Sequence, residues 1–365
     1  MRVGFVGWRG MVGSVLMDRM RAEGDFAGLE PHFFSTSAAG RPGPIEGGEV
    51  PLLDARDTAA LAACEVVITC QGGDYTQAVH PTLRANGWRG VWIDAASALR
   101  MEPNSCLVLD PVNGEAVRAA LAAGVGDYVG ANCTVSLLLM ALVGLLRTGE
   151  VRFVTTMSYQ AASGAGAQAM LELLAQMRHI GDVAGPHLDA GARALAVERT
   201  VRQGLTGAPT AVLGAPLAGS ALPWIDRGLA NGQTREEWKA QAEASKLMGT
   251  PTAIDGMCVR IGALRSHAQG LAIHLRRPMP LDEVSACLSE AHDWVTVVPN
   301  DKDTTLRELT PTATSGSLSV PIGRLRPSVV GPDVLHAFTV GDQLLWGAAE
   351  PLRRMLHLVR EHREA

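Results

Sequence analysis

Apolar runs alternate with amphipathic stretches along the first third of the chain. Short apolar segments at residues 2–7, 31–34, 64–70 and 91–93 have the length and composition of buried strands. A segment with helical spacing, residues 14–23, follows the first of them. Strands that alternate with helices predict an α/β domain with a parallel, doubly wound sheet and helices on both faces.

The pattern changes near the middle of the chain. Residues 137–146 are almost all apolar and predict a buried helix, and residues 151–158 predict a strand. Residues 234–248 predict a further helix. Residues 258–275 predict two strands with a break near residues 264–266. We therefore expect a second domain of α+β type.

Two later segments are less regular. A helix that begins after Ala167 is predicted to end near Arg178, and residues 179–222 are too rich in Gly, Pro and Ala to assign. The segment from Gly341 to His362 predicts a helix that packs back onto the first domain, because a doubly wound sheet needs cover on both faces. The predicted boundaries are 1–131 plus 342–365 for the first domain and 132–341 for the second.

Composition narrows the class of protein. A chain of 365 residues with 47% apolar and 19% charged residues is typical of a soluble enzyme with two domains, and a net charge of −5 argues against binding to nucleic acid. The six cysteines form no CxxC and no Cys/His cluster, so we expect no metal site and no disulfide framework. No apolar run is long enough to span a membrane and no signal pattern opens the chain, which predicts a cytoplasmic protein without membrane association.

A glycine turn follows the first predicted strand. Gly7, Gly10 and Gly13 form G-x-x-G-x-x-G between a strand and a helix, a variant of the dinucleotide-binding signature. The second strand ends in Ser35-Thr36-Ser37, where an NAD-preferring site usually has an acidic residue. These hydroxyls and Arg9 suit a 2′-phosphate, so NADP is favoured over NAD. A plain strand–turn–helix and a solvated loop also fit the pattern.

Cys133 lies in Gly-Ala-Asn-Cys-Thr-Val-Ser, directly before the predicted buried helix. The helix dipole and the free N–H groups of the first turn are expected to lower its pKa and could hold an oxyanion. This position suits a nucleophile. A buried cysteine that acts as a small apolar residue also fits.

Several charged residues are further candidates. Arg100 follows a predicted strand and could bind a phosphate or carboxylate, or lie on the surface. Glu236 and Lys239 share a helix face and could form an ordinary solvated ion pair. Arg260 and His267 are seven residues apart, which in one regular strand puts them on opposite faces. If both serve one site, the chain must bend between them.

With these pieces in place, the chain resembles the aspartate-β-semialdehyde dehydrogenases of Gram-negative bacteria over its whole length. The resemblance rests on eight ordered motifs: GFVGWRGMVGSVLM, FFSTS, ASALRM, GANCTVSLLLMAL, YQAASGAGA, TREEWKAQAE, CVRIGALRSHAQ and GDQLLWGAAEPLRRML. It implies a Rossmann-like NADP-binding domain and a catalytic and dimerisation domain of the glyceraldehyde-3-phosphate dehydrogenase-like type.

The resemblance also implies a role for individual residues. Cys133 is similar to the nucleophile, His267 to the acid–base residue and Gln160 to the residue that orients the substrate. Arg260 and Glu236 resemble the groups that bind the substrate carboxylate and ammonium. The phosphate site is implied at Arg100, Lys239 and Asn132. The NADP site is implied at Gly7, Arg9, Gly10, Met11, Val12, Thr36, Ser37, Gln71, Ser163, Gly164, Ala165, Gly166, Ala167 and Gln343.

The implied reaction is the reversible, NADPH-dependent reductive dephosphorylation of L-aspartyl-4-phosphate to L-aspartate-4-semialdehyde through a cysteine thioester. It belongs to the biosynthesis of lysine and diaminopimelate, threonine and methionine, and the implied assembly is a homodimer. The alternatives are a reductase of another acyl phosphate such as N-acetylglutamyl phosphate, a phosphorylating glyceraldehyde-type dehydrogenase, a catalytically silent NADP-binding sensor, and a cysteine hydrolase. Glu236 distinguishes L-aspartyl-4-phosphate from N-acetylglutamyl phosphate, because an acetylated nitrogen carries no charge for a carboxylate to bind.

Overall fold

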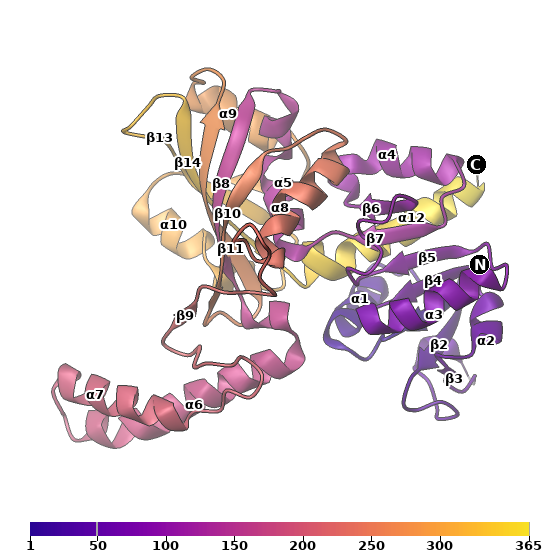
Figure 1. Ribbon diagram of the computed structural model, residues 1–365, viewed down its shortest axis with the longest axis horizontal. Coiled ribbons are helices and arrows are strands. Elements are labelled where there is room, and N and C mark those ends of the chain that lie inside the picture. Colours follow the sequence, from indigo (N-terminus) through magenta and orange to yellow (C-terminus); the bar gives the residue numbers. More distant parts are fainter. Residues whose placement is uncertain (49, 365) are drawn as a thin grey trace.

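The computed structural model describes residues 1–48 and 50–364, and its first sheet is a parallel one with seven strands (Figure 1). The strand order is β3-β2-β1-β4-β5-β7-β6, so the order reverses beside β1, as in a doubly wound fold. This confirms the Rossmann-like prediction. The strands are β1 (Arg2–Val6), β2 (Glu30–Ser35), β3 (Leu53–Asp54), β4 (Val66–Thr69), β5 (Val91–Asp94), β6 (Ser105–Val108) and β7 (Asp127–Gly130). The connecting helices are α1 (Met11–Ala22), η1 (Ile45–Gly47), α2 (Thr58–Ala62), α3 (Gly73–Ala85) and α4 (Asp110–Ala122).

Both faces of this sheet are buried, which explains the continuous apolar runs of its strands. Val3 and Phe5 pack in one cluster with residues of α1, whereas Val6 and Val67 pack in another with residues of α2 and α3. Neighbouring residues of a strand point to opposite faces, so a strand covered on both sides must be apolar at every position.

The C-terminal segment closes the first face. α12 (Glu350–Glu364) buries Leu352 and Met355 in the cluster that holds Phe5. The prediction of one helix from Gly341 was wrong at its start. That part completes β14 (Val334–Asp342), because Gly341 pairs with His267 and Asp342 with Ser266, and a short π-helix, η4 (Leu345–Ala349), precedes α12.

The second sheet is mixed and lies beside the first (Figure 1). Its order is β12-β13-β14-β11-β8-β10-β9, with β10 parallel and β11 antiparallel to β8. Its other strands are β8 (Val151–Gln160), β9 (Ala221–Leu222), β10 (Ile254–Ile261), β11 (Ser266–Leu275), β12 (Val295–Val297) and β13 (Val320–Pro327). Its helices are α5 (Cys133–Arg147), η2 (Ala162–Ala165), α6 (Ala167–Asp189), α7 (Ala194–Gly204), η3 (Leu205–Gly207), α8 (Arg235–Met248), α9 (Leu281–Ser289), α10 (Lys302–Glu308) and α11 (Pro311–Thr314).

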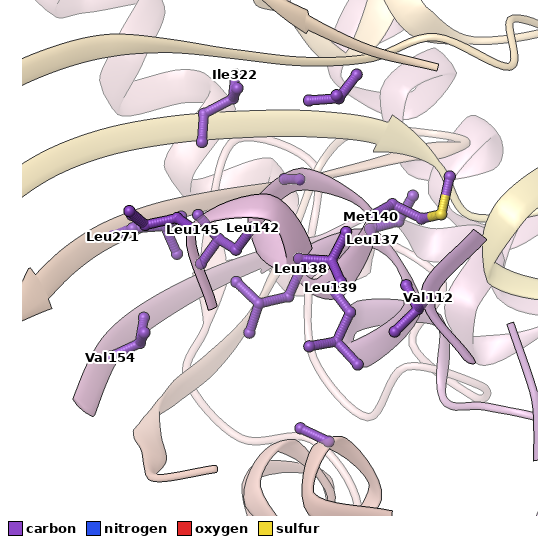
Figure 2. Packing of buried hydrophobic residues seen from close by; sticks show 14 of the residues in the cluster. Val112, Leu137, Leu138, Leu139, Met140, Leu142, Leu145, Val154, Leu271 and Ile322 are labelled. Carbon is purple, nitrogen blue, oxygen red and sulfur yellow. The ribbon is translucent and has the colours of Figure 1, made fainter. Parts of the chain in front are cut away.

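The predicted buried helix is α5, and it is the centre of the second domain. Leu142 and Leu145 pack in one apolar cluster with Val154 and Leu271 of the sheet (Figure 2). The helix starts at Cys133, four residues before the apolar run begins. The second domain therefore confirms the expected α+β class.

α6 runs eleven residues past its predicted end and forms a projecting pair with α7 (Figure 1). Glycines and Pro186 in this part favour a break. Tertiary packing overrides them, because Gly204 of α7 closely approaches Val183 of α6 and the His179 ring lies 2.8 Å from the carbonyl oxygen of Gly204.

In the part of the chain that the structure describes, no helix is long and apolar enough to cross a membrane.

Candidate active site

Cys133 is the first residue of α5, and Asn132 is its N-cap. The Oδ1 atom of Asn132 accepts hydrogen bonds from the N–H groups of Thr134 and Val135, at 3.0 and 3.3 Å. Its Nδ2 atom donates to Glu236 at 2.9 Å. The cap leaves the N–H of Cys133 directed out of the helix start, where it could stabilise an oxyanion.

The sulfur of Cys133 lies 3.3 Å from Nε2 of His267. The N–H of Ala161 donates to Nδ1 of His267 at 3.0 Å, so Nδ1 carries no proton and the neutral ring carries its proton on Nε2. Burial, with a contribution from Arg260, lowers the pKa of His267 to about 3. The resemblance implies an acid–base role for His267. In this arrangement the ring can donate its Nε2–H toward sulfur, but it has no free nitrogen to accept the thiol proton.

The strand order explains how Arg260 and His267 meet. β10 and β11 lie on opposite sides of β8, with Arg260 paired to Gln160 and Ala268 paired to Tyr159. His267, Gln160 and Arg260 therefore lie in a row at one end of three adjacent strands. The expected bend is real, because the segment between β10 and β11 crosses over the end of β8.

The pKa of Cys133 differs from the sequence-based expectation. Burial raises it to about 12, and the nearby Glu236 adds to the rise, while Arg100, Arg260 and Lys239 act in the opposite direction. The prediction of a lowered pKa was wrong for the unliganded site, because local helix geometry says nothing about removal of the sulfur from water.

Arg260 is buried, with 6% of its surface exposed, and its Nη1 atom donates to the carbonyl oxygen of Ala161 at 2.7 Å. No carboxylate of residues 1–48 or 50–364 lies within ion-pair distance of it. Burial lowers the pKa of Arg260, although an arginine stays charged at any physiological pH. A buried cation without a partner is costly, which favours an anionic ligand here.

α8 supplies a buried ion pair. A capping box between Thr234 and Glu237 starts the helix, and Nζ of Lys239 lies 2.9 Å from Glu236 and 3.1 Å from Asp226. Burial acts to raise the pKa of Glu236, but the charge of Lys239 and the hydrogen bonds from Lys239, Asn132 and Gln160 together outweigh it and hold the pKa below its usual value. The predicted shared face is correct, and the pair is buried rather than solvated.

These groups surround a cavity of about 520 Å³ between the two sheets. A larger cavity of about 610 Å³ lies beside β6 and α4, but its cations are already occupied: Arg84 donates to backbone carbonyls, and Nζ of Lys246 donates to the carbonyl oxygens of Arg100 and Glu102 and to the Ser105 hydroxyl. An ammonium with all three donors in use is not a base toward Ser105. We therefore take the smaller cavity as the candidate active site. It is lined by Met11, Val12, Ala95, Ser97, Arg100, Asn132, Cys133, Gln160, Ser163, Gly164, Ala165, Gly166, Ile225, Asp226, Glu236, Lys239, Arg260, Gln343, Leu344, Gly347 and Ala348.

An adjoining cavity of about 490 Å³ surrounds the glycine turn. A Cβ atom on Gly7, whose φ is +72°, would lie 2.6 Å from the backbone of Gln71, and one on Gly13 would lie 2.2 Å from the Gly7 carbonyl oxygen. Arg9 donates to the hydroxyls of Ser35 and Ser37, at 2.9 and 3.4 Å. The turn therefore has the shape of a dinucleotide cradle. The cavity is lined by Gly7, Trp8, Arg9, Gly10, Phe34, Ser35, Thr36, Ser37, Cys70 and Gln71.

Most residues singled out in the sequence line one of these two cavities. Ala167 lines neither and begins α6, while His267 reaches the site through Cys133. Sequence reasoning missed Asp226, whose φ of +70° is unusual for a residue other than glycine. It also missed Gly347 of η4, where a Cβ atom would lie 2.7 Å from that of Cys133. No spacing rule identifies either residue.

A dinucleotide cradle that opens toward a cysteine–histidine pair defines a dehydrogenase of the thiol-dependent class. Family models agree with this class. The NAD-binding domain of semialdehyde dehydrogenases matches residues 2–120, and the semialdehyde dehydrogenase dimerisation domain matches residues 142–346. The chain belongs to the semialdehyde dehydrogenase family.

Solved structures extend the comparison. Aspartate semialdehyde dehydrogenase from Francisella tularensis is 44% identical, with a TM-score of 0.95 over 99% of this chain and 100% of that one. Aspartate semialdehyde dehydrogenase II from Vibrio cholerae, complexed with ASA, is 22% identical with a TM-score of 0.80 over 99% and 98%. The Candida albicans enzyme with NADP is 16% identical with a TM-score of 0.67 over 100% and 99%. The last two show the fold alone.

Proposed function

We propose that this protein interconverts L-aspartyl-4-phosphate and L-aspartate-4-semialdehyde through a thioester on Cys133. The observation that carries the proposal is the content of one cavity: a thiol next to His267, an unpaired buried Arg260 and a buried Glu236. Each of these groups matches one part of an amino-acid acyl phosphate. The pathway role in the biosynthesis of lysine, threonine and methionine follows from this reaction.

Formation of the thioester needs no side chain of the protein to act as a base. The sulfur of Cys133 attacks the acyl carbon, the C–O bond to phosphate breaks, and the thiol proton leaves with the phosphate. A nicotinamide held by Ser163 to Ala167 and Gln343 would supply the hydride that reduces the thioester carbon. The Nε2–H of His267 and the N–H of Cys133 then hold the oxyanion, which collapses to the aldehyde and releases Cys133 as a thiolate. The thiolate takes a proton from solvent, which restores the thiol.

The charged residues bind the other substrate groups. Arg260 holds the α-carboxylate in a two-pronged geometry, and Glu236 holds the ammonium, with Gln160 orienting the acyl group. Arg100, Lys239 and the Asn132 amide receive the phosphate. A buried Glu236 carboxylate disfavours an acetylated nitrogen, which weakens the case for N-acetylglutamyl phosphate.

The test is phosphate-dependent reduction of NADP in the presence of aspartate semialdehyde. We expect turnover that requires phosphate, and at least tenfold lower efficiency with N-acetylglutamate semialdehyde or glyceraldehyde-3-phosphate. Cofactor binding without turnover of any of the three would support the silent sensor. Phosphate-independent hydrolysis of a thioester or amide would support the cysteine hydrolase.

We further propose NADP as the preferred cofactor. Arg9 with the hydroxyls of Ser35 and Ser37 offers charge and donors to a 2′-phosphate, and no carboxylate follows β2 directly. Ser163 to Ala167 and Gln343 would hold the nicotinamide end, because Gln343 donates to the Ser163 hydroxyl at 2.8 Å and keeps its amide oxygen for the ligand.

Replacement of Thr36 by aspartate tests this preference. A carboxylate beside the 2′-phosphate repels it and can instead accept from ribose hydroxyls, so the NADP-to-NAD ratio of kcat/KM should fall by roughly tenfold or more. The measurement is steady-state kinetics with both cofactors, with Thr36→Ser as the matched control. Equal efficiencies for the two cofactors in the wild-type enzyme would refute the proposal.

A homodimer is also proposed. The face of the second sheet turned away from α5 carries Phe153, Met157 and Phe338, which are only half-buried, and Met257 is 47% exposed. An apolar sheet face of this kind favours burial against a second copy. Sedimentation at micromolar concentration should give about twice the 38.5 kDa chain mass, and a single 38.5 kDa species would contradict the dimer.

A further inference from the structure

Arg100 follows β5 and has a guanidinium anchored at every nitrogen. Nε donates to the carbonyl oxygen of Gly130 at 2.8 Å, Nη2 to that of Ala95 at 3.3 Å, and Nη1 to the carboxylate of Glu243 at 3.3 Å. A guanidinium has five N–H donors, so two remain, one on each Nη atom. Because Arg100 lines the candidate active site, these two donors are available to two oxygens of one phosphate.

The sequence motifs assigned no role to Glu243. Only 1% of its surface is exposed. It lies on α8, one helical turn after Lys239, so it faces the same way. Its Oε2 atom accepts from the N–H of Asn132 at 2.6 Å, while Oε1 accepts from Arg100. One carboxylate therefore joins three segments: α8, the loop after β5, and the residue that caps the nucleophile helix.

We propose that Glu243 is the positioning residue of the phosphate site. It aims the two free donors of Arg100 and holds them in register with Cys133 through the Asn132 backbone. Glu243 itself does not touch substrate. The inference rests on the proposed function, because it takes Arg100 as the phosphate-binding arginine.

Glu243→Gln is the sharpest variant, because it keeps the size and one acceptor. The short bond from Asn132 holds the amide oxygen, so the new NH2 group faces Nη1 of Arg100 and two donors meet in a buried place. The guanidinium must move away. Loss of two directed bonds to phosphate outweighs the weaker, undirected attraction gained when the negative charge of Glu243 is removed.

The experiment measures the three Michaelis constants in the direction that consumes phosphate, for Glu243→Gln, Arg100→Lys and the double variant. We expect Glu243→Gln to raise the Michaelis constant for phosphate by roughly tenfold or more. The Michaelis constants for NADP and for the semialdehyde should change by less than about twofold. The double variant should resemble Arg100→Lys alone, because a positioning residue has no effect once the group it positions is altered.

Glu237→Gln is the matched control. Its carboxylate lies on the same helix and accepts from the backbone of Thr234 and Cys258, outside the cavity. If Glu243→Gln and this control raise all three constants alike, the role of Glu243 is structural and the inference fails. It also fails if Glu243→Gln leaves the phosphate constant unchanged while Arg100→Lys raises it. If Arg100→Lys leaves that constant unchanged, the proposed phosphate site itself is wrong.

Discussion

Replacement of Cys133 by serine is expected to reduce turnover to below about one thousandth of the wild-type value, while NADPH affinity stays near normal. A hydroxyl at this position is a far poorer nucleophile than sulfur at neutral pH. The measurement combines steady-state turnover with a fluorescence titration of NADPH. Cys287→Ser, on α9, is the control and should keep its activity. More than about a tenth of wild-type activity in Cys133→Ser would remove Cys133 from the role.

The raised pKa of Cys133 adds a pH signature to the same experiment. A thiol with a pKa of about 12 is almost fully protonated at neutral pH. The rate of alkylation of Cys133 by iodoacetamide in the unliganded enzyme should therefore rise about tenfold per pH unit between pH 7 and 9, without a plateau. A plateau in this range would indicate a thiolate formed with a pKa near neutrality, as the helix dipole alone suggests.

Replacement of Arg260 by lysine is expected to cost about 2–4 kcal/mol in transition-state binding, which lowers kcat/KM by roughly 30- to 900-fold. Arginine can present two parallel donors to the substrate carboxylate, and an ammonium cannot copy this geometry. Arg260 also keeps its contact with the carbonyl oxygen of Ala161, so the lysine would lose orientation as well as a donor. The measurement is kcat/KM for aspartate semialdehyde at saturating phosphate and NADP.

Glu236→Gln provides the comparison on the other side of the substrate. The ammonium is held alike in ground and transition states, so this change should mainly raise the Michaelis constant for the semialdehyde. Neither variant should alter NADP affinity much. If both variants lost NADP binding while their Michaelis constants for the semialdehyde stayed unchanged, the substrate site would lie elsewhere. The assignment to aspartate semialdehyde would then fail.

Local patterns were enough to predict several parts of the fold. The apolar segments of the first domain predicted a parallel sheet, and the glycines of the turn at Gly7 predicted a dinucleotide cradle. The apolar run after Cys133 predicted the central helix of the second domain. These features depend on backbone sterics and on which faces are buried, and both are written into neighbouring residues.

The extended α6 shows where local patterns fail. Glycines and Pro186 favour a break after Arg178, yet the helix continues because α7 packs along it. Propensity is a weak preference that a few tertiary contacts can override. The same limit applies to Gly341, which belongs to a strand because its partner in β11 is His267.

The chain by itself determined which side chains are available for chemistry, and the resemblance of its motifs indicated their roles. Only the tertiary structure decided that β10 and β11 lie on either side of β8, which brings Arg260 and His267 to one end of the sheet. It also decided the proton position on His267, through the N–H of Ala161, and the burial that raises the pKa of Cys133. These properties depend on contacts between residues far apart in the sequence, such as Arg260 with Gln160 and His267 with Ala161. No local spacing encodes such contacts.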